Sequence, residues 1–255
     1  MSANLIALIV VVCTFGGALS GMLLRRVLPD HHFCTASQDT VKITIGLVGS
    51  MTALVLGLVT ASAKTSYDEV DAAVKQTAVN LLSLDRLLAR YGSDASEMRT
   101  ALKSAIESRV ETIWPEIVVG SGRAADRSTS PAQLHEGFAD RIAALTPNDD
   151  AHRALQSRAF ELAESLLEQR WLLVSQTETP VPTAFLVILV FWLTVTFGSY
   201  GLYAPVNGTT MAALFLGSVS VAAAIFLVLE LGTPFEGQVK ISGEPIHRAA
   251  GLMAR

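Results

Sequence analysis

The chain has 255 residues, of which 51% are hydrophobic and 16% charged, with a net charge of −4 and a mean hydropathy of +0.44. Soluble domains carry about 25% charged residues, so this composition excludes an ordinary soluble protein. The acidic balance, without a Lys/Arg-rich patch or an RNA-binding motif, argues against a nucleic-acid partner.

Four stretches carry almost no charge, and each approaches the ~20 residues that a helix needs to cross ~30 Å of hydrocarbon. They are residues 5–24, 43–63, 181–203 and 211–229. Most of the charged residues lie between the second and third stretches. The sequence therefore predicts an all-α integral membrane protein with four transmembrane helices in two hairpins that flank a soluble helical bundle. The predicted parts are a first hairpin (1–63), the bundle (64–180), a second hairpin (181–229) and a C-terminal tail (230–255) that packs on the bundle.

The first stretch has two interpretations, a retained membrane helix or a cleaved signal peptide. A signal peptide needs a basic segment before its apolar run. No Lys or Arg precedes Leu5, and the basic pair Arg25–Arg26 follows the run. A retained helix is therefore favoured.

Potential metal ligands gather only around the adjacent pair His31-His32, next to Cys34. No second ligand pair stands at a zinc-type spacing, so a solvated loop is favoured over a metal site. Cys13 lies inside the first apolar stretch, at a different depth from Cys34, so the two do not indicate a disulfide. No metal and no cofactor are predicted.

The second stretch carries small residues at a spacing of four. Gly49, Ala53, Gly57 and Ala61 form this stripe, which Gly46 and Ser50 widen. Small side chains let helix backbones approach closely in lipid. One interpretation is packing against another helix of the same subunit. The other is packing around the axis of an oligomer, which leaves four larger residues to face lipid or a pore: Met51, Leu54, Val55 and Leu58.

After Lys64 the apolar period continues at spacings of four and three, as expected for helices that pack side by side. The seam consists of Val70, Val74, Thr77, Leu81, Leu84, Leu88 and Tyr91. No Pro interrupts residues 41–91, so we expect one unbroken helix of roughly 75 Å. Gly92 is a natural stop. Asp94 with Glu97, and Thr146 before Pro147, then predict the starts of two later helices.

No catalytic constellation is present in the sequence. There is no G-x-S-x-G, H-E-x-x-H or phosphate-binding loop motif. The charged residues of the bundle form the polar faces that its helices need. The sequence therefore predicts no catalytic residues and no enzyme.

Several local features resemble the bacterial bestrophin-like domain family. They are Tyr67-Asp68-Glu69 and Asn80 after the second stretch, Trp114-Pro115, Arg170-Trp171-Leu172, Phe197-Gly198 and Asn207. The closing segment matches best, with Glu230, Pro234-Phe235-Glu236-Gly237, Val239, Ile241 and Ser242-Gly243-Glu244-Pro245. Gly232 and Thr233 stand where the family usually has Asp and Arg, which argues against an essential ion pair at these positions.

This resemblance implies a distant relation to bestrophins, which are oligomeric ion channels whose second membrane helix lines the pore and whose helical domain lies in the cytosol. It implies a homo-oligomer (a pentamer by analogy), lipid and inorganic ions as partners, and a bacterial inner-membrane location. We therefore predict a homo-oligomeric, channel-like membrane protein with its pore around the second membrane helix. The alternative is a non-conducting membrane scaffold or sensor whose bundle binds a partner.

The tail offers a second set of candidate residues at the membrane exit: Glu230, Pro234, Phe235, Glu236 and Glu244. A carboxylate at the lipid–water boundary stays hydrated at little cost. A clamp that joins bundle and membrane is favoured over a pore-mouth or ligand role for Glu230 and Glu236.

Basic residues near the ends of the spans favour a cytoplasmic bundle and cytoplasmic termini. On the side of the bundle lie Lys64, Lys75, Arg170, Lys240 and Arg248; on the other side lie Arg25, Arg26 and Lys42.

Overall fold

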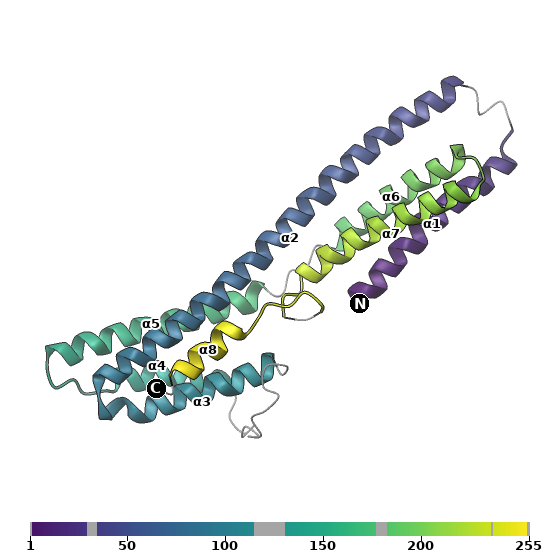
Figure 1. The fold of residues 1–255 in the computed structure, drawn as a ribbon. Coiled ribbons are helices and arrows are strands. Elements are labelled where there is room, and N and C mark those ends of the chain that lie inside the picture. Colours follow the sequence, from purple (N-terminus) through teal and green to yellow (C-terminus); the bar gives the residue numbers. More distant parts are fainter. Residues whose placement is uncertain (1, 30–34, 115–130, 177–182, 236, 254–255) are drawn as a thin grey trace. The chain divides into compact units, whose positions relative to one another are not determined.

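The computed structural model describes residues 2–29, 35–114, 131–176, 183–235 and 237–253, and these residues contain helices but no β-strand. Figure 1 shows the helices in chain order. They are α1 (Ala3–Val27), α2 (Thr35–Tyr91), the 3-10 helix η2 (Ser93–Ala95), α3 (Ser96–Ile113), α4 (Pro131–Ala143), α5 (Asp150–Gln176), α6 (Thr183–Tyr203), α7 (Gly208–Leu231) and α8 (Glu244–Leu252).

The chain divides into two compact units. Unit one comprises Met1–Tyr67 and Thr179–Lys240, and unit two comprises Asp68–Glu178 and Ile241–Arg255. Four described helices are long and apolar enough to cross a bilayer, namely α1, α2, α6 and α7. The predicted class, an all-α membrane protein with four spans, is therefore confirmed.

Helix α2 is the longest element of the chain. It runs without interruption for 57 residues, as the absence of Pro and the continuous apolar period predict. Residues 35–67 of this helix belong to unit one and residues 68–91 to unit two. Helix α2 therefore contributes a membrane-spanning segment to unit one and a helical segment to the bundle of unit two.

In unit one, α1 packs against α6 and α7 (Figure 1). Val10 of α1, Leu193 of α6 and Ile225 of α7 belong to one buried apolar cluster. In lipid there is no hydrophobic force between helices, so tight van der Waals contact must hold them together.

The contact between α1 and α6 is close enough to bring backbone against backbone. A Cβ added at Gly21 would collide with the carbonyl oxygen of Gly198, and one added at Gly201 would collide with that of Ala18. At Gly17 an added Cβ would lie 2.8 Å from the Thr194 carbonyl oxygen. The crossing therefore requires glycine on both helices.

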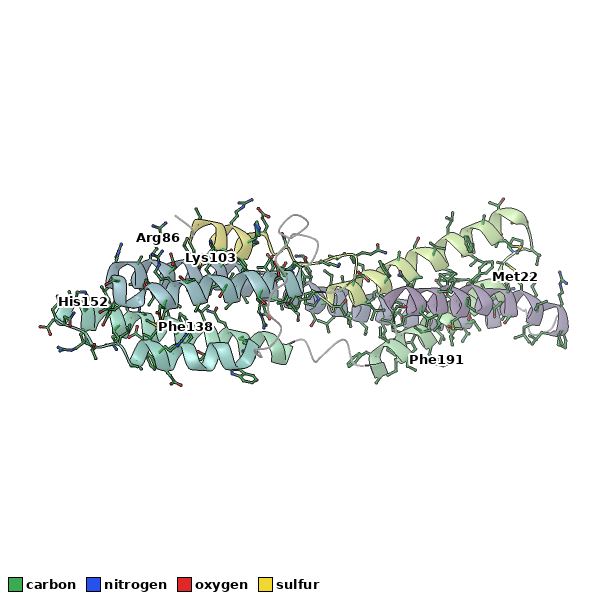
Figure 2. All side chains as sticks on the ribbon, turned by 90° about the horizontal axis from the view of Figure 1, so that it is seen from below. Met22, Arg86, Lys103, Phe138, His152 and Phe191 are labelled. Atoms are coloured by element: carbon green, nitrogen blue, oxygen red, sulfur yellow. The ribbon has the colours of Figure 1, made fainter. Side chains whose placement is uncertain are left out.

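Unit two is built on the seam of α2. Six of its seven residues are at most 8% exposed: Val70, Val74, Leu81, Leu84, Leu88 and Tyr91. The part of the seam from Leu81 onward shares one core with residues of α3, α4, α5 and α8, and Phe138 of α4 packs against it (Figure 2). The helical seam predicted from spacing is thus confirmed.

A buried ion pair joins α2 to α3 inside this unit. Arg99 Nε donates to Asp85 Oδ1 at 2.8 Å, and Arg99 Nη2 donates to Asp85 Oδ2 at 3.1 Å. The Asp85 side chain is only 3% exposed, so both carboxylate oxygens depend on this guanidinium. The hydrogen bond with Asp85 raises the pKa of Arg99 above its ordinary value.

Two predicted helix starts are wrong. Asp94 does not cap α3, because the chain first makes the turn η2, whose Ser93 carbonyl accepts the N–H of Ser96. Thr146 does not cap α5 either. Asp149 takes that role, since its Oδ1 accepts from the backbone N–H of His152 at 2.7 Å. Gly92 does end α2, with a positive φ of 106°.

The first prediction concerns the α1–α6 crossing. Gly21→Ala should lower the free energy of unfolding by about 1–3 kcal/mol, because the new methyl group must push two backbones apart. Gly16→Ala on the same helix is the matched control, since no atom of the residues that the structure describes lies within 4 Å of its added Cβ. The control should be neutral or stabilising by up to about 1 kcal/mol, owing to the better helix propensity of Ala. Thermal unfolding of the purified protein in detergent measures both, and equal midpoints for the two variants would contradict a close crossing.

Candidate functional site on the second membrane helix

The membrane segment of α2 has one face that packs within unit one. Ile45 is 8% exposed and Thr52 4%, and both point to this face. Val55 and Leu56 pack against the apolar cluster formed by α1, α6 and α7. Further along, Ala63 is buried with Val228 of α7. This face accounts for the contacts of the segment inside one chain.

The opposite face carries large apolar side chains that the chain leaves uncovered. Leu54 is 74% exposed, Leu58 69% and Met51 51%. Of the four large residues singled out from the sequence, these three share the open face. Val55 is half-buried and lies on the packed side.

The stripe of small residues borders this open face. Gly46, Ala53, Gly57 and Ala61 are exposed, and Gly49 is half-buried. Among the described residues, nothing lies within 4 Å of a Cβ added at Gly46, Gly49 or Gly57. Within one chain these three glycines therefore do not support close packing of another helix, in contrast to the glycines between α1 and α6.

The open face carries no ionisable side chain between Lys42 and Lys64. Two exposed hydroxyl groups of the segment are bonded to their own helix: Thr44 Oγ1 donates to the Thr40 carbonyl at 2.9 Å, and Ser50 Oγ donates to the Gly46 carbonyl at 2.9 Å. Such bonds satisfy a hydroxyl in an apolar medium. The face therefore offers apolar surface without a fixed charge.

At the end of α7, Glu230 is buried to 5% exposure. Its Oε2 accepts hydrogen bonds from the backbone N–H groups of Gln238 and of Val239, the latter at 3.3 Å. Backbone donors stabilise a buried carboxylate by charge-assisted hydrogen bonds. We call Glu230, Gly237, Gln238 and Val239 the carboxylate clamp.

Gly237 makes the clamp geometrically feasible. Its φ is +85°, a conformation that favours glycine. An added Cβ would also collide with the Glu230 carboxylate. Of the other tail candidates in this segment, Pro234 is buried and Phe235 half-buried. Glu236 lies outside the described residues.

The tail is held again inside unit two. Trp114 Nε1 donates to the Ile241 carbonyl at 2.8 Å, and Ile241 is 1% exposed. Gly243 lies against the indole, because an added Cβ would be 2.5 Å from Trp114 Cδ2. Glu244, the last tail candidate, begins α8 and forms an exposed ion pair with Arg248 at 2.9 Å.

The sequence motifs include Trp114, Gly237 and Gly243 but do not reveal that Trp114 contacts the tail or that Gly237 lies against Glu230. The contact of Gly17 and Gly21 with α6 was also missed, although their Gly-x-x-x-Gly spacing is a signal for close helix packing in membranes. A helix period reveals which residues share a face, but it does not identify the partner.

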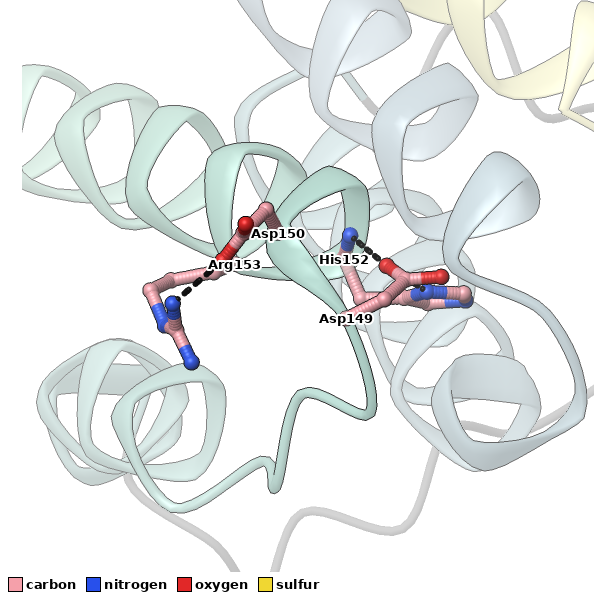
Figure 3. Close-up of polar contacts among 4 residues, drawn as sticks. All are labelled: Asp149, Asp150, His152 and Arg153. Atoms are coloured by element: carbon pink, nitrogen blue, oxygen red, sulfur yellow. Dashed lines mark hydrogen bonds and ion pairs between the residues drawn. The ribbon is translucent and has the colours of Figure 1, made fainter.

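A cluster of polar side chains at the start of α5 most resembles a ligand-binding site (Figure 3). His152 Nδ1 lies 2.6 Å from Asp149 Oδ1, and Arg153 pairs with Asp150 at 2.6 Å. The backbone N–H of His152 holds the pKa of Asp149 below its ordinary value, and the His152 ring lowers it further. The described residues contain no group of three or more side chains that could hold a metal. This arrangement caps a helix.

The His152 ring also contacts the end of the α2 seam. It stands edge-on to the ring of Tyr91, with centroids 5.1 Å apart. Burial raises the pKa of the Tyr91 hydroxyl, and the carboxylates of Asp94 and Asp149 raise it further. The phenol is therefore neutral at physiological pH.

The second prediction tests the carboxylate clamp. In Glu230→Ala, the amides of Gln238 and Val239 should exchange with solvent at least about tenfold faster, because each loses a hydrogen bond to a charged group. Gly237→Ala should have a similar effect, since the clamp cannot close around a methyl group. Hydrogen exchange followed by mass spectrometry measures both. Glu244→Ala, which removes an exposed carboxylate of the same tail, is the control, and unchanged exchange in Glu230→Ala would contradict the clamp.

Comparisons with known proteins assign this architecture to a family. Residues 12–246 match the model of the bestrophin-like domain. The fold resembles that of a bacterial bestrophin homologue from Klebsiella pneumoniae. One variant of that homologue gives a TM-score of 0.67 at 14% identity, with 100% of each chain covered. Another variant gives 0.68 at 15% identity, covering 99% of this chain and 96% of the other.

A third structure of the homologue, obtained by zinc phasing, gives a TM-score of 0.65 at 14% identity, covering 98% of this chain and 95% of that one. A search of curated proteins found no match. At these identities the structural likeness establishes the fold, and the match over residues 12–246 establishes descent. The chain therefore belongs to the bestrophin-like family.

Proposed function

We propose that this protein is one subunit of a homo-oligomeric, ion-conducting membrane protein whose pore is lined by α2. The observation that carries the proposal is the open face of the α2 membrane segment. Leu54 and Leu58 are 74% and 69% exposed there, and no atom of the described residues lies within 4 Å of a Cβ added at the neighbouring glycines. Membership in the bestrophin-like family supports the same function.

The two halves of the open face suit two different neighbours. Successive residues of a helix are rotated by about 100°, so the small residues Gly46, Ala53 and Gly57 form one side of the face. Small residues give close helix contact in lipid. We assign this side to contact with the next copy of the chain, which supplies the partner that the chain itself lacks.

The larger side chains on the other half would then face the axis. Met51, Leu54 and Leu58 are the pore-lining candidates of this proposal, while Val55 packs within its own unit. Apolar rings in a narrow pore gate conduction by excluding water. Because the face has no fixed charge, selectivity would not arise from a ring of charged side chains in this segment.

The remaining assignments follow from the family and the charges. We assign the protein to the bacterial inner membrane, with unit two and both termini in the cytoplasm, on the basis of the excess of Lys and Arg at the ends of the spans on that side. A pentamer follows by analogy with bestrophins. We assign no catalytic role to any residue, because membership in the bestrophin-like family favours a channel over an enzyme.

The third prediction tests the pore. Leu54→Cys in proteoliposomes should lose most of its ion flux when a charged, water-soluble thiol reagent is added, because the modified side chain narrows a wet pore. The background is Cys13→Ser/Cys34→Ser, which removes the two native thiols. Leu8→Cys on α1 is the control, as Leu8 is a 59% exposed residue of another span and should not react. Unaltered flux in Leu54→Cys, or equal reaction at Leu8→Cys, contradicts the assignment.

The fourth prediction tests self-association. Gly57→Leu should shift the purified protein from its native oligomer toward smaller species, because an isobutyl group on the small side prevents close approach of the next copy. Multi-angle light scattering measures the mass. Gly16→Leu, at another glycine with free space around it, should leave the mass unchanged. A native protein that is monomeric, or an intact oligomer in Gly57→Leu, contradicts the proposed interface. A stable oligomer without flux for any common ion would favour the scaffold or sensor instead.

A further inference from the structure

The end of α1 carries a pair of cations among apolar neighbours. Arg25 and Arg26 stand in the last turn of the helix, and both are exposed. Leu23 and Leu24 before them and Val27 after them are each more than half exposed. Exposed apolar side chains of a membrane span contact lipid, and arginines near the end of a span extend toward the polar interface. The two guanidinium groups therefore lie at the boundary between hydrocarbon and water.

The end of α6 lies beside this pair. Helices α1 and α6 pack side by side (Figure 1), and a Cβ added at Gly21 would lie 2.9 Å from the backbone nitrogen of Leu202. One turn further along α1, Arg25 Nη1 donates to the carbonyl oxygen of Ala204 at 3.2 Å. This hydrogen bond holds the Arg25 guanidinium against the end of α6.

The end of α6 adds aromatic and apolar surface at the same corner. Tyr200, one turn before Ala204, is half-exposed, and its ring stands edge-on to that of Phe197 with centroids 6.2 Å apart. Tyrosines gather at the level of lipid headgroups, because the ring is apolar and the hydroxyl polar. Val206, beyond Ala204, is also half-exposed. Both helix ends thus present the surface that is typical of the lipid–water interface.

The neighbouring spans offer the two arginines no carboxylate. Residues 1–29 and 183–229 contain neither Asp nor Glu. Asp30 follows closely in the sequence but lies outside the described residues. Because α1 ends at Val27 and Leu28 is already extended, the helical spacing of four does not connect Arg26 with Asp30. Among the described residues, Arg26 has no ion-pair partner.

The start of α2 provides a contrasting cation. Lys42 lies on the same side of the membrane as Arg25 and Arg26, because α1 and α2 are consecutive spans. Its Nζ lies 3.8 Å from Asp39 Oδ1 of its own helix, so this cation has a local carboxylate. The positive charge of the two arginines is not balanced in this way by α1 or α6.

We propose that Arg25 and Arg26 bind the headgroup phosphate of an anionic phospholipid at the end of α1. Guanidinium groups bind phosphate oxygens through planar, charge-assisted hydrogen bonds. A guanidinium carries five N–H groups, so the bond from Arg25 to Ala204 does not exhaust its donors. The phosphate oxygens accept from both arginines and offset their charge where water is scarce.

The apolar neighbours favour a lipid over a free phosphate. Both sources present the same oxygens, but only a lipid also places acyl chains against Leu23, Leu24 and Val27. The charge of the site favours an anionic lipid. In phosphatidylcholine the choline group would bring a further cation toward the arginines, whereas phosphatidylglycerol has no cation of its own.

The site does not depend on ion conduction. It requires only that α1 and α6 are membrane spans, as their length and composition indicate. In the orientation proposed above, the pair lies on the side of the membrane that usually carries fewer basic residues. A specific anionic partner accounts for two arginines at that place.

The experiment compares thermal unfolding of the full-length protein in nanodiscs of phosphatidylcholine alone and of phosphatidylcholine with phosphatidylglycerol. Phosphatidylglycerol should raise the midpoint of the natural sequence by about 2–4 °C, because a ligand that binds only the folded state stabilises it. Arg26→Gln should lose most of this shift. Arg26→Lys should keep part of it, since lysine supplies the charge without the planar donors. Lys42→Gln, the matched control that removes one positive charge on the same side of the membrane, should keep the whole shift.

Two further variants separate lipid binding from contacts within the chain. Arg25→Gln also loses the hydrogen bond to Ala204, so its midpoint should fall in both kinds of nanodisc. The difference between the two lipid compositions is therefore the quantity compared, and it should shrink as in Arg26→Gln. In Asp30→Asn this difference should stay the same or grow. A shift that appears only in Asp30→Asn would mean that Asp30 already pairs with the arginines, and it would overturn the proposal.

A last arm adds inorganic phosphate to phosphatidylcholine nanodiscs, with sodium chloride of equal ionic strength as the reference. No shift is expected. A shift as large as that with phosphatidylglycerol would assign a free phosphate and overturn the headgroup assignment. The proposal also fails if phosphatidylglycerol does not shift the natural sequence, or if Lys42→Gln loses the shift equally, since the response would then be one to general surface charge. None of these outcomes depends on ion flux, so the channel function keeps its separate test.

Discussion

The structure depends on a constraint on α2, which must serve as a membrane span and as part of a water-exposed bundle without a break in its hydrogen bonds. Its 57 residues form one helix, so every side chain between Thr35 and Tyr91 has a direction fixed by a single period. In the span the buried side is shallow, with Ile45, Thr52 and Ala63 at most 8% exposed. In the bundle the seam is deep, and Leu84 and Leu88 are almost fully enclosed. The bundle segment of α2 is therefore enclosed by its own chain, whereas one face of its membrane segment stays exposed.

Glycines illustrate this difference within unit one. Between α1 and α6, the backbone of the other helix fills the space beside the glycines, since Gly21 and Gly201 bring the two backbones into direct contact. On α2, by contrast, no atom of the described part of the chain lies within 4 Å of a Cβ added at Gly46 or Gly57. Gly costs about 1 kcal/mol relative to Ala in a helix, and lipid chains do not need glycine in order to pack. In the proposed oligomer, a second copy of the same helix would fill the space beside these glycines.

The sequence was sufficient for features that repeat. The four apolar stretches, the unbroken α2 and the seam from Val70 to Tyr91 all follow from period and length, and the structure bears them out. Features that depend on one contact were not predictable. The caps at Asp94 and Thr146 were misplaced because a 3-10 turn and Asp149 supply the acceptors instead. Helix α8 and the hydrogen bond from Trp114 to the Ile241 carbonyl require knowledge of which segments are neighbours. For the candidate site, the sequence grouped Val55 with Met51, Leu54 and Leu58. In the structure Val55 instead packs against the apolar cluster of unit one.

The carboxylate clamp also explains how Glu230 is held without an ion pair from the residues that follow α7. Gly232 and Thr233, which follow α7 directly, offer Glu230 no cationic side chain. Two backbone N–H groups, from Gln238 and Val239, take that place here. Thr233 Oγ1 lies 3.3 Å from the Glu230 carbonyl and so bonds to the backbone of α7 instead of to the carboxylate. Backbone donors have no long side chain to order, so they stabilise a buried carboxylate with a smaller loss of conformational entropy than an arginine would. This solution requires a glycine at position 237, and it makes the geometry of the tail, rather than an ion pair, the determinant of how α7 ends.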